Sequence, residues 1–360
     1  MKIAVVSTVN VKHMTLISKY TSLFQKNSIN FDLINIDKYD EEEDIGQTNQ
    51  YKYKIYIDRE WSFYKKLKKY IGFYGFSKRI IKENEYDYLV IWNSFTAVIL
   101  FPLLLNRMRK KYILNIRDYA FEKNKIIYFL MSKLVSNSIF TTISSRGFLS
   151  FLPKSKKYVM MHSFNEDILS RDLVTTKKRT PSKPIRICFI GNVRFFENDK
   201  KLLEAFKNDQ RFILQFFGQN SEVLEDYAIL HNIKNVEFIG RFDHKKTREL
   251  LNKADVINNL YGYNNIALDT AISIKFYYAL HLSLPILVYP NTFIANESEK
   301  MGNGYIVNEI NFDLPNKFYK WYIELNHKQM SLNCKKSLEI IKKENEEFEN
   351  KLELFLKEIN

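Results

Sequence analysis

Short apolar runs alternate with amphipathic segments along most of the chain. The alternation begins with Ile3–Ser7, a helical pattern through Phe24 and a second apolar run at Phe31–Ile36. Short apolar runs bounded by polar residues are typical of buried strands, and apolar residues three or four positions apart are typical of helices. Strands that alternate with helices predict a parallel sheet covered by helices. Further strands are expected at Tyr88–Trp92, Tyr112–Ile116, Ser138–Ile143 and Tyr158–Met161.

The same alternation starts again at Ile185–Ile190, after a polar and proline-containing segment. A chain of 360 residues is long enough for two domains with separate cores. We therefore predict an α/β protein with Rossmann-like parallel-sheet domains at 1–165 and 185–312 and a linker at 166–184. Residues 313–360 read as two helical stretches, the second with an apolar stripe.

The stretch from Ala254 to Tyr289 reads as a strand, a polar loop, a helix and a second strand. In open parallel sheets, ligands bind outside the carboxyl ends of the strands, where this loop is expected to lie. Ser273 and Lys275 fall in the first turn of the helix. The free N–H groups of a helix start, the helix dipole and a lysine ammonium all favour an anion. A phosphate-bearing ligand is the first expectation.

This helix resembles a segment of the nucleotide-sugar glycosyltransferases of GT-B fold, especially family 4 and its relatives in capsular and exopolysaccharide biosynthesis. The family segment is written K-x-x-E-A/Y-L/M-x-x-G-x-P, and the corresponding residues are Lys275, Tyr278, Ala279, Leu280, Ser283 and Pro285. The paired glutamates of the family fall on Thr270 and Tyr278, and Asp269 is the nearest carboxylate. The resemblance implies two domains that face each other across a cleft, with a final helix that packs back on the first domain.

The loops that follow the strands of the second domain also resemble the family's donor site, where the donor is the nucleotide sugar. Gly191 permits close approach to a pyrophosphate, and Arg194 supplies a planar cation that stays charged. Arg241 and Phe242 lie in the loop that the family uses to hold the nucleotide base. The donor-binding residues implied by the resemblance are Gly191, Asn192, Arg194, Gly218, Arg241, Phe242, Asp269, Thr270, Ser273, Lys275 and Tyr278.

Candidate catalytic residues in the first domain are Arg117 and Asp118, which end one of the expected strands. The resembled family often has a histidine and an aspartate at this place, facing the acceptor. Asp118 is expected either to orient an acceptor hydroxyl or to cap the next helix. His13, in the first loop, is a candidate for acceptor binding or an ordinary surface histidine.

Most of the positive charge lies in the first half of the chain. Residues 1–165 contain 27 Lys and Arg against 14 Asp and Glu, whereas residues 166–360 contain 28 against 27. Trp61–Lys82 carries seven basic residues and no acidic one, interleaved with aromatics, which predicts a pair of interfacial helices on an anionic membrane. The alternative is a core of aromatics with a solvated basic face. The expected membrane contacts are Lys65, Lys66, Lys68 and Lys69.

Several function classes lack their signals in the sequence. The two cysteines, Cys188 and Cys334, read as reduced thiols, and the chain has no signal-peptide pattern and no apolar run of membrane-spanning length. No G-x-G-x-x-G, P-loop, G-x-S-x-G, metal-ligand cluster or D-x-D pair is present. We expect no metal, no other cofactor and no nucleic-acid partner, and a cytoplasmic protein attached peripherally to the inner face of the plasma membrane.

The preferred function is therefore a glycosyltransferase of hexosyl or N-acetylhexosaminyl type. Its donor would be a UDP- or GDP-linked sugar and its acceptor a lipid-linked oligosaccharide in surface polysaccharide biosynthesis. The resemblance implies a retaining and metal-independent reaction. Two alternatives stay open: a non-catalytic binding subunit with this fold, motivated by the missing glutamates, and a sugar-nucleotide epimerase, which needs acid and base carboxylates.

Overall fold

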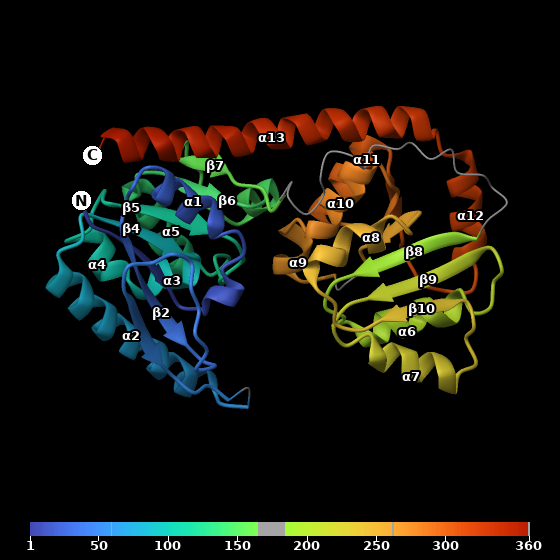
Figure 1. Cartoon of the computed structure of the whole chain (residues 1–360), viewed down its shortest axis with the longest axis horizontal. Helices are drawn as coiled ribbons and strands as arrows, with labels where there is room; N and C mark the ends of the chain where they lie inside the picture. The colour runs from blue at the N-terminus through green and yellow to red at the C-terminus, as the bar shows by residue number, and fades with distance from the viewer. Residues whose placement is uncertain (59, 165–183, 261–262, 359–360) are drawn as a thin grey trace. The chain divides into compact units, whose positions relative to one another are not determined.

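The structure, a computed structural model, describes residues 1–358 apart from residues 59, 165–183 and 261–262. It divides into two units, drawn in Figure 1: the first comprises Met1–His162 with Lys343–Asn360, and the second comprises Ser163–Lys342. The linker predicted at 166–184 lies outside the described residues, except for Pro184.

Within the described residues, the first unit contains a seven-stranded parallel sheet with strand order β3-β2-β1-β4-β5-β6-β7. Its strands are β1 (Ile3–Ser7), β2 (Phe31–Asp37), β3 (Gln50–Lys54), β4 (Tyr88–Trp92), β5 (Tyr112–Ile116), β6 (Thr141–Ile143) and β7 (Tyr158–Met160). Its helices are α1 (Ser18–Lys26), α2 (Phe63–Asn84), α3 (Ser94–Ile99), α4 (Phe101–Leu105) and α5 (Lys125–Asn137), with the short 3-10 helices η1 (Val11–His13) and η2 (Arg146–Ser150).

One face of this sheet is covered by α1 and by the C-terminal part of α13 (His327–Glu358). Tyr20 and Phe24 of α1 pack with Phe348 and Leu352 of α13 in the same buried cluster. The apolar stripe of the last helix therefore contributes to the cores of both units, because its earlier residues Cys334 and Ile341 belong to a core cluster of the second unit.

Two expectations for the first unit are corrected. Residues 63–84 form the single helix α2 rather than a pair, because Gly72 and Gly75 are both accommodated inside it. β3 was not expected, since its sequence QYKYK lacks an apolar run; it lies at the edge of the sheet, where its residues are only partly buried.

The second unit contains, within the described residues, a six-stranded parallel sheet with strand order β10-β9-β8-β11-β12-β13. Its strands are β8 (Ile185–Ile190), β9 (Phe212–Phe217), β10 (Val236–Ile239), β11 (Val256–Asn258), β12 (Ile286–Val288) and β13 (Gly304–Ile306). Its helices are α6 (Phe196–Ala205), α7 (Glu222–Leu230), α8 (Thr247–Leu251), α9 (Ile266–Thr270), α10 (Ile274–Leu282), α11 (Phe293–Met301) and α12 (Leu314–Glu324), with the 3-10 helix η5 (His244–Lys246).

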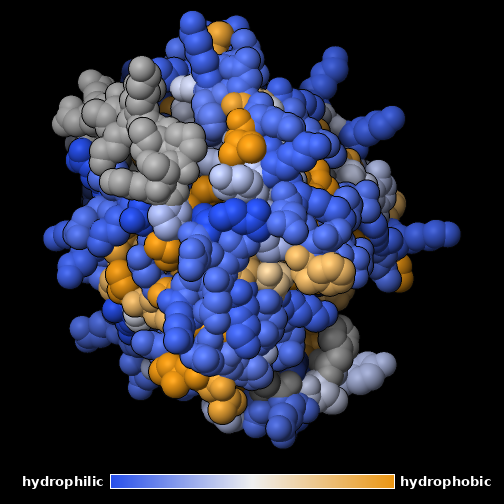
Figure 2. Space-filling view, turned by 90° about the vertical axis from the view of Figure 1, so that its right-hand side faces the viewer, coloured by the Kyte–Doolittle hydropathy of each residue, from blue (hydrophilic) through white to orange (hydrophobic). Residues whose placement is uncertain are grey.

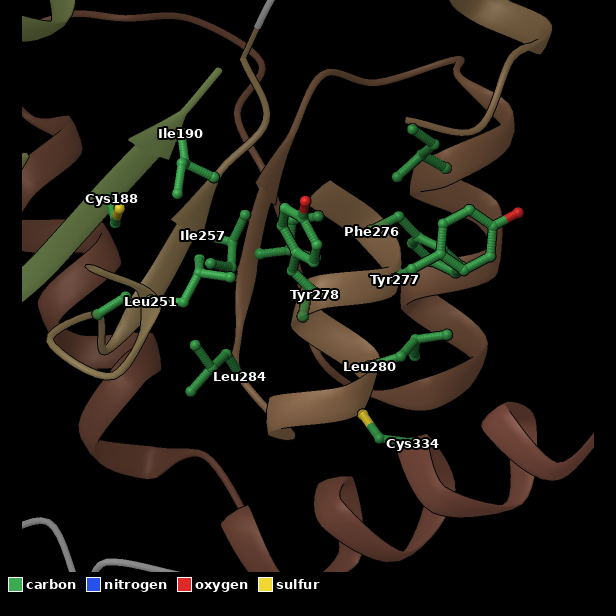
Figure 3. Packing of buried hydrophobic residues seen from close by; sticks show 14 of the residues in the cluster. Cys188, Ile190, Leu251, Ile257, Phe276, Tyr277, Tyr278, Leu280, Leu284 and Cys334 are labelled. Atoms are coloured by element: carbon green, nitrogen blue, oxygen red, sulfur yellow. The ribbon is translucent and has the colours of Figure 1, made fainter. Parts of the chain in front are cut away.

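Successive side chains of β8 point to opposite faces of this sheet, as strand geometry requires. Cys188 and Ile190 pack against α10 and α11, whereas Ile187 and Phe189 pack against α6. Figure 3 shows the first of these clusters, in which Tyr278 of α10 is directed toward Ile257 of β11. The two parallel sheets confirm the prediction of two Rossmann-like α/β domains, and Cys188 and Cys334 are buried free thiols.

Candidate functional site

The candidate site of the second unit lies at the carboxyl ends of β8 and β11. β8 is the first strand of this unit along the chain, and its neighbours in the sheet are β9 on one side and β11 on the other. The direction of winding reverses between β8 and β11, and this is where open α/β sheets bind ligands. Gly191 follows β8 and Asn259 follows β11, so both lie at this edge.

The start of α10 is fixed to the same edge by Ser273. Ser273 is the N-cap residue of α10, but its side chain makes no capping hydrogen bond. Its hydroxyl instead donates to Oδ1 of Asn259, at 2.7 Å. This bond joins the first turn of α10 to the end of β11, which holds the positive end of the helix dipole beside the strand ends.

Lys275 is the central cation of this edge. Its side chain is 8% exposed, and its Nζ lies 4.6 Å from the centre of the Phe189 ring. α10 packs on the face that Cys188 and Ile190 line, whereas Phe189 belongs to the face of α6. The side chain of Lys275 therefore reaches from one face toward the other at the end of β8. Burial lowers the pKa of Lys275 to about 8; Asp199 opposes this and Arg194 adds to it.

Asp199 of α6 is a member of this group that the sequence analysis missed. It is 2% exposed, and burial raises its pKa to about 7, opposed by the charge of Lys275. A signal for it was present, because Asp199 lies three positions before Leu202, on the apolar face of an amphipathic helix. An acidic residue on an apolar helix face indicates that a polar or positively charged partner is also buried.

Two glycines shape the loops at this edge. Gly191 has φ +128°, and a Cβ added there would meet open space, so the backbone is accessible and requires glycine. Gly218, which follows β9, has φ +139°, and a Cβ added there would lie 1.9 Å from the carbonyl oxygen of Gly191. The lack of a side chain at Gly218 therefore allows the two loops to approach closely. Asn192 is part of the same contact, since its Oδ1 accepts a hydrogen bond from Asn220 at 2.9 Å.

The other predicted donor residues of the loops differ in exposure. Arg194 is exposed, and its charge contributes to the lowered pKa of Lys275. Arg241 is also exposed. Phe242 is partly buried and packs against the core cluster of α10, which gives it a structural role beside the predicted one. Asp243 caps η5 by accepting a hydrogen bond from the backbone N–H of Lys245.

The two positions of the missing glutamates have different surroundings. Thr270 lies at the end of α9, where its hydroxyl donates to the carbonyl of Ile266 at 2.5 Å, and the adjacent Asp269 is partly buried. Tyr278 is 7% exposed and belongs to the core cluster of α10 in Figure 3. Burial raises its pKa to about 12, so its hydroxyl stays protonated and neutral.

In the first unit, Arg117 and Asp118 follow β5. Arg117 donates a hydrogen bond to the carbonyl of Met161 at 3.2 Å, which ties the end of β5 to the segment after β7. Asp118 retains exposed surface, yet burial of part of the group raises its pKa, against the influence of Arg117. Asp118 does not cap the next helix, because Asn124 is the N-cap of α5.

Glu122 is a buried carboxyl close to Asp118 that the sequence analysis missed. Its side chain is fully buried and accepts a hydrogen bond from the backbone N–H of Ala120 at 2.5 Å. Burial raises the pKa of Glu122, the side chain of Ser94 opposes this rise, and the charge of Asp118 adds to it. Ser94, the first residue of α3, therefore lies close to Glu122.

A strained residue lies at the corresponding switch point of this sheet, between β1 and β4. Asn93 has φ 71° and ψ 158°, a conformation that residues other than glycine rarely adopt. Its Oδ1 accepts hydrogen bonds from both N and Oγ1 of Thr96, at 2.8 and 2.9 Å. Oγ1 of Thr96 in turn accepts from the N–H of Thr8, at 3.0 Å. Such strain is concentrated at functional sites, which makes this edge the candidate acceptor side of the first unit.

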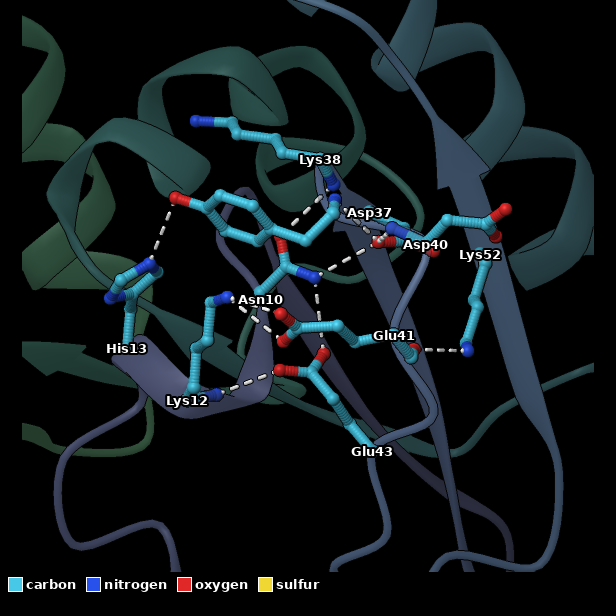
Figure 4. Close-up of polar contacts among 10 residues, drawn as sticks. Asn10, Lys12, His13, Asp37, Lys38, Asp40, Glu41, Glu43 and Lys52 are labelled. Carbon is cyan, nitrogen blue, oxygen red and sulfur yellow. Dashed lines mark hydrogen bonds and ion pairs between the residues drawn. The ribbon is translucent and has the colours of Figure 1, made fainter.

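His13 is exposed and lies in a polar network of the first loops, which Figure 4 shows. Its Nε2 lies 3.2 Å from the hydroxyl of Tyr39, and Nζ of Lys12 lies 3.4 Å from the centre of the same ring. Lys12 also pairs with Glu41 at 2.8 Å. The acidic segment after β2 therefore offsets positive charge near His13.

The basic helix α2 presents most of its predicted membrane residues to solvent. Lys65, Lys68 and Lys69 are exposed and Lys66 is partly exposed, together with Tyr64 and Ile71 at 81% and 59% exposure. Phe73 and Ile81 are buried. Aromatic residues are thus divided between the core and the exposed face. Figure 2 shows a different face, the one at the right-hand side of Figure 1 and away from α2; that face is mostly hydrophilic, with separate hydrophobic groups.

Two features are absent from the described part of the chain. No helix there is long and apolar enough to cross a membrane. No group of three or more His, Cys, Asp or Glu side chains among the described residues could hold a metal ion.

Comparison with known proteins identifies the fold. No protein-family model matches the chain, and no curated protein matches it. Solved structures do match: sucrose-phosphate synthase from Thermosynechococcus elongatus has a TM-score of 0.67 at 12% identity and covers 100% of this chain and 98% of its own. Anabaena HepE in complex with UDP has a TM-score of 0.64 at 10% identity, covering 98% and 99%.

The apo form of the lipopolysaccharide outer core galactosyltransferase WaaB has a TM-score of 0.64 at 14% identity, covering 99% and 100%. A UDP-N-acetylglucosamine 2-epimerase is also similar, with a TM-score of 0.58 at 10% identity, covering 92% and 90%. This chain has the GT-B fold, as its resemblance to that class implied.

Proposed function

We propose that the protein is a glycosyltransferase that moves a hexosyl or N-acetylhexosaminyl group from a nucleotide sugar to an acceptor hydroxyl. The observation that carries this proposal is the buried ammonium of Lys275, in the first turn of α10, which lies over the ring of Phe189 at the switch point of the second sheet. The diphosphate of a UDP- or GDP-sugar is the chemical partner of such a group. The similar HepE structure contains UDP, which supports this choice of donor.

Charge on the departing nucleoside diphosphate is met by cations of the chain itself. Arg194 is exposed and can donate to phosphate oxygens, while Lys275 supplies positive potential from a poorly solvated position, where charge acts more strongly. The first N–H groups of α10 add their dipole. This arrangement supports a reaction without a metal ion, and the resemblance in sequence favours retention of configuration.

The acceptor side of the proposal rests on the first unit. Asp118, with its raised pKa, is the candidate to hold an acceptor hydroxyl, and Arg117 fixes the end of its strand. His13 is a further candidate contact. A lipid-linked oligosaccharide, elongated at the cytoplasmic face of the plasma membrane for a surface polysaccharide such as a capsule, suits the basic charge of this half and the exposed lysines of α2.

Two other functions have specific support. An epimerase is favoured by the similar epimerase structure, but Thr270 and Tyr278 offer no carboxylate for proton transfer. A binding subunit without activity is favoured by the same two residues. Both alternatives would retain nucleotide-sugar binding.

The experiment is a binding and transfer screen with UDP-glucose, UDP-galactose, UDP-N-acetylglucosamine and GDP-mannose. Thermal shift identifies the donor, and release of UDP or GDP with a lipid-linked acceptor extract measures transfer. We expect one donor to bind and to release its nucleotide only when acceptor is added. Interconversion of the sugar without release of nucleotide would indicate an epimerase, and binding without either reaction would indicate the binding subunit.

A further inference from the structure

The outer face of α5 in the first unit presents large apolar side chains to solvent. Phe121, in the loop before the helix, is 62% exposed, and Ile126 and Phe129 in its first two turns are 70% and 57% exposed. Ile126 and Phe129 are three positions apart, so they lie on the same side of the helix. Three large apolar residues are thus exposed together at one end of one element.

Basic side chains accompany these apolar residues. Lys125 and Lys133 of α5 are exposed, and Nζ of Lys133 lies 5.4 Å from the centre of the Phe129 ring. Within residues 119–137 the only acidic residue is Glu122, which is fully buried. The surface formed by this helix and the loop before it is therefore apolar and positive. We call it the α5 face; it comprises Phe121, Lys123, Lys125, Ile126, Phe129 and Lys133.

The positive charge continues around the C-terminal turn of α5. Nε of the exposed Arg109 donates to Oδ1 of Asn137, the last residue of the helix, at 2.9 Å. The backbone N–H of Lys110 donates to the carbonyl of the same residue at 3.0 Å, and Nζ of Lys157 donates to the carbonyl of Ser136 at 2.8 Å. These bonds hold three more cationic residues beside the helix, so positive charge extends along its whole length.

The start of α5 has two features that are unfavourable for the protein alone. Phe121 has φ 68°, a left-handed conformation that is uncommon for a bulky residue, and this conformation accompanies an exposed ring. Lys123 and Lys125 flank the N-cap residue Asn124, and the first turn contains no acidic residue, although the helix dipole disfavours cations there. A partner that is both apolar and anionic accounts for both features.

We propose that the α5 face docks on an anionic lipid bilayer, with Phe121, Ile126 and Phe129 inserted among the lipids and the lysines at the headgroups. This inference deepens the proposed function, on which it rests for the lipid-linked acceptor. Asp118, the candidate to hold the acceptor hydroxyl, lies three residues before Phe121, so docking here brings that carboxyl to the surface that presents the acceptor. The basic helix α2 belongs to the same layer, because α3 contacts both α2 and α5.

The charge of the α5 face favours a bilayer over other occupants. Ile229 and Leu230 of α7 are at least as exposed as the apolar residues of the α5 face. That helix has no lysine and carries the exposed acidic residues Glu222, Glu225 and Asp226. Exposed apolar side chains alone therefore do not distinguish the α5 face, whereas their combination with cations does. A second copy of the chain, bound through the same face about a twofold axis, would set lysines against lysines.

The test is co-sedimentation with vesicles of phosphatidylglycerol and phosphatidylcholine, for the wild type and two matched variants. The α5 variant combines Phe121→Ser, Ile126→Ser and Phe129→Ser. The control variant combines three exposed positions of α7, Val223→Ser, Ile229→Ser and Leu230→Ser. We expect the α5 variant to bind the vesicles at least tenfold more weakly than the wild type, and the control to differ by less than twofold. All six positions are exposed, so both variants should unfold in urea at the wild-type midpoint.

High salt separates the α5 face from the lysines of α2. Salt screens charges but does not screen the insertion of apolar side chains, so the difference between the wild type and the α5 variant should persist at high salt. Equal vesicle binding by the wild type and the α5 variant, or equal losses in the α5 and control variants, would overturn the proposal. Self-association of the wild type through these residues, without vesicle binding, would also overturn it and would indicate a second copy.

A spin label measures insertion directly. Cys188 and Cys334 are buried, so a nitroxide reagent reacts selectively with the cysteine that Ile126→Cys introduces. On vesicles, we expect oxygen, which concentrates in the bilayer, to relax this label more than a water-soluble nickel chelate does. A label at Ile229→Cys should show the opposite preference. A label at position 126 that stays accessible to the nickel chelate on bound protein would overturn the proposal.

Vesicle binding needs no nucleotide sugar, so this inference and the proposed function fail separately. Weaker vesicle binding by the α5 variant alone, in a protein that binds no donor, would support the docking surface and overturn the glycosyltransferase. Transfer from a donor, with vesicle binding that the α5 substitutions leave unchanged, would support the glycosyltransferase and overturn the docking surface.

Discussion

Nε2 of the buried His162 lies 2.5 Å from Oε2 of Glu344, which follows it by 182 residues. The backbone N–H of His162 also donates to Oδ1 of Asn345 at 2.8 Å, and Arg146 pairs with Glu344. These bonds fasten the last helix beside the point where the chain leaves the first unit, since that unit comprises Met1–His162 and Lys343–Asn360.

Glu344→Gln should therefore destabilise the first unit. Burial would raise the pKa of Glu344, but hydrogen bonds from His162 and Arg146 outweigh it and lower the pKa below its usual value. A carboxyl with a lowered pKa in the folded state stabilises the protein above its ordinary pKa, and this contribution is lost as pH falls through the folded value. We expect a loss of about 1.5 to 3 kcal/mol in urea unfolding at pH 7, which shrinks below about pH 4. Glu346→Gln, an exposed neighbour on α13, is the control.

Gly218→Ala should destabilise the second unit strongly. The new methyl group would lie 1.9 Å from the carbonyl oxygen of Gly191, and φ of +139° is unfavourable for alanine. Both effects act on backbone, which cannot move as easily as a side chain, so we expect a loss of about 2 kcal/mol or more in the free energy of unfolding. Gly75→Ala in α2, where a Cβ meets open space, should be neutral or stabilising. Equal stability of the two variants would show that the loops can separate.

The position of Ser273 and Lys275 near a strand end could be predicted from the sequence because its signals are local. Ser273 and Lys275 belong to one helix start, and the strand that precedes them is apolar, so their place at a strand end follows from the chain itself. Asp199 could not be assigned to Lys275 in this way. Its position on an apolar helix face is visible, but its partner depends on how α6 and α10 pack on opposite faces of the sheet.

Two other features could not be predicted from the sequence, for a different reason. β3 is polar and forms only because β2 offers it a free edge, which is a property of the sheet rather than of QYKYK. The strain at Asn93 accompanies hydrogen bonds with Thr96, which in turn accepts a hydrogen bond from Thr8, in the loop after β1. Long-range contacts of this kind leave no periodicity in the sequence.

Removing one cation from the donor site should weaken donor binding. Lys275→Met removes the buried charge with little change in volume, and Arg194→Ala removes the exposed one. Loss of a charge-assisted interaction with the diphosphate should cost about 2 to 3 kcal/mol, or roughly 30- to 150-fold in kcat/KM for the donor. Lys234→Ala, at an exposed position of the same unit, is the control and should leave kcat/KM unchanged. Values within threefold of wild type for both site variants would contradict the assignment.

Transfer should not require a divalent metal ion. The charge of the leaving diphosphate is assigned to Arg194, Lys275 and the start of α10, and the described residues contain no cluster of metal-ligating side chains. We expect activity after exhaustive treatment with EDTA to equal that of untreated enzyme within twofold. A strict need for Mg²⁺ or Mn²⁺, restored on addition of the ion, would show that donor binding uses a metal.

The last prediction concerns the membrane. Lys65, Lys68 and Lys69 project from α2 with the exposed Tyr64 and Ile71, a combination that suits lipid headgroups. Each basic residue near an anionic surface contributes about 1 kcal/mol, so a few of them suffice for reversible attachment that salt weakens. We expect the protein to sediment with vesicles containing phosphatidylglycerol at low salt, less so at high salt, and little with neutral phosphatidylcholine vesicles.

Charge alone could give the same result from any basic surface, so the position of the lysines has to be tested. Changing Lys65, Lys66, Lys68 and Lys69 to glutamine should lower vesicle binding at least tenfold, since it removes four charges from one helix. Changing Lys207, Lys234, Lys245 and Lys253, all exposed on the second unit, removes the same charge and should have a much smaller effect. Equal losses in the two variants would indicate attraction by net charge without a docking surface on α2. Binding to neutral and anionic vesicles alike would favour an acceptor free in solution and a solvated role for these lysines.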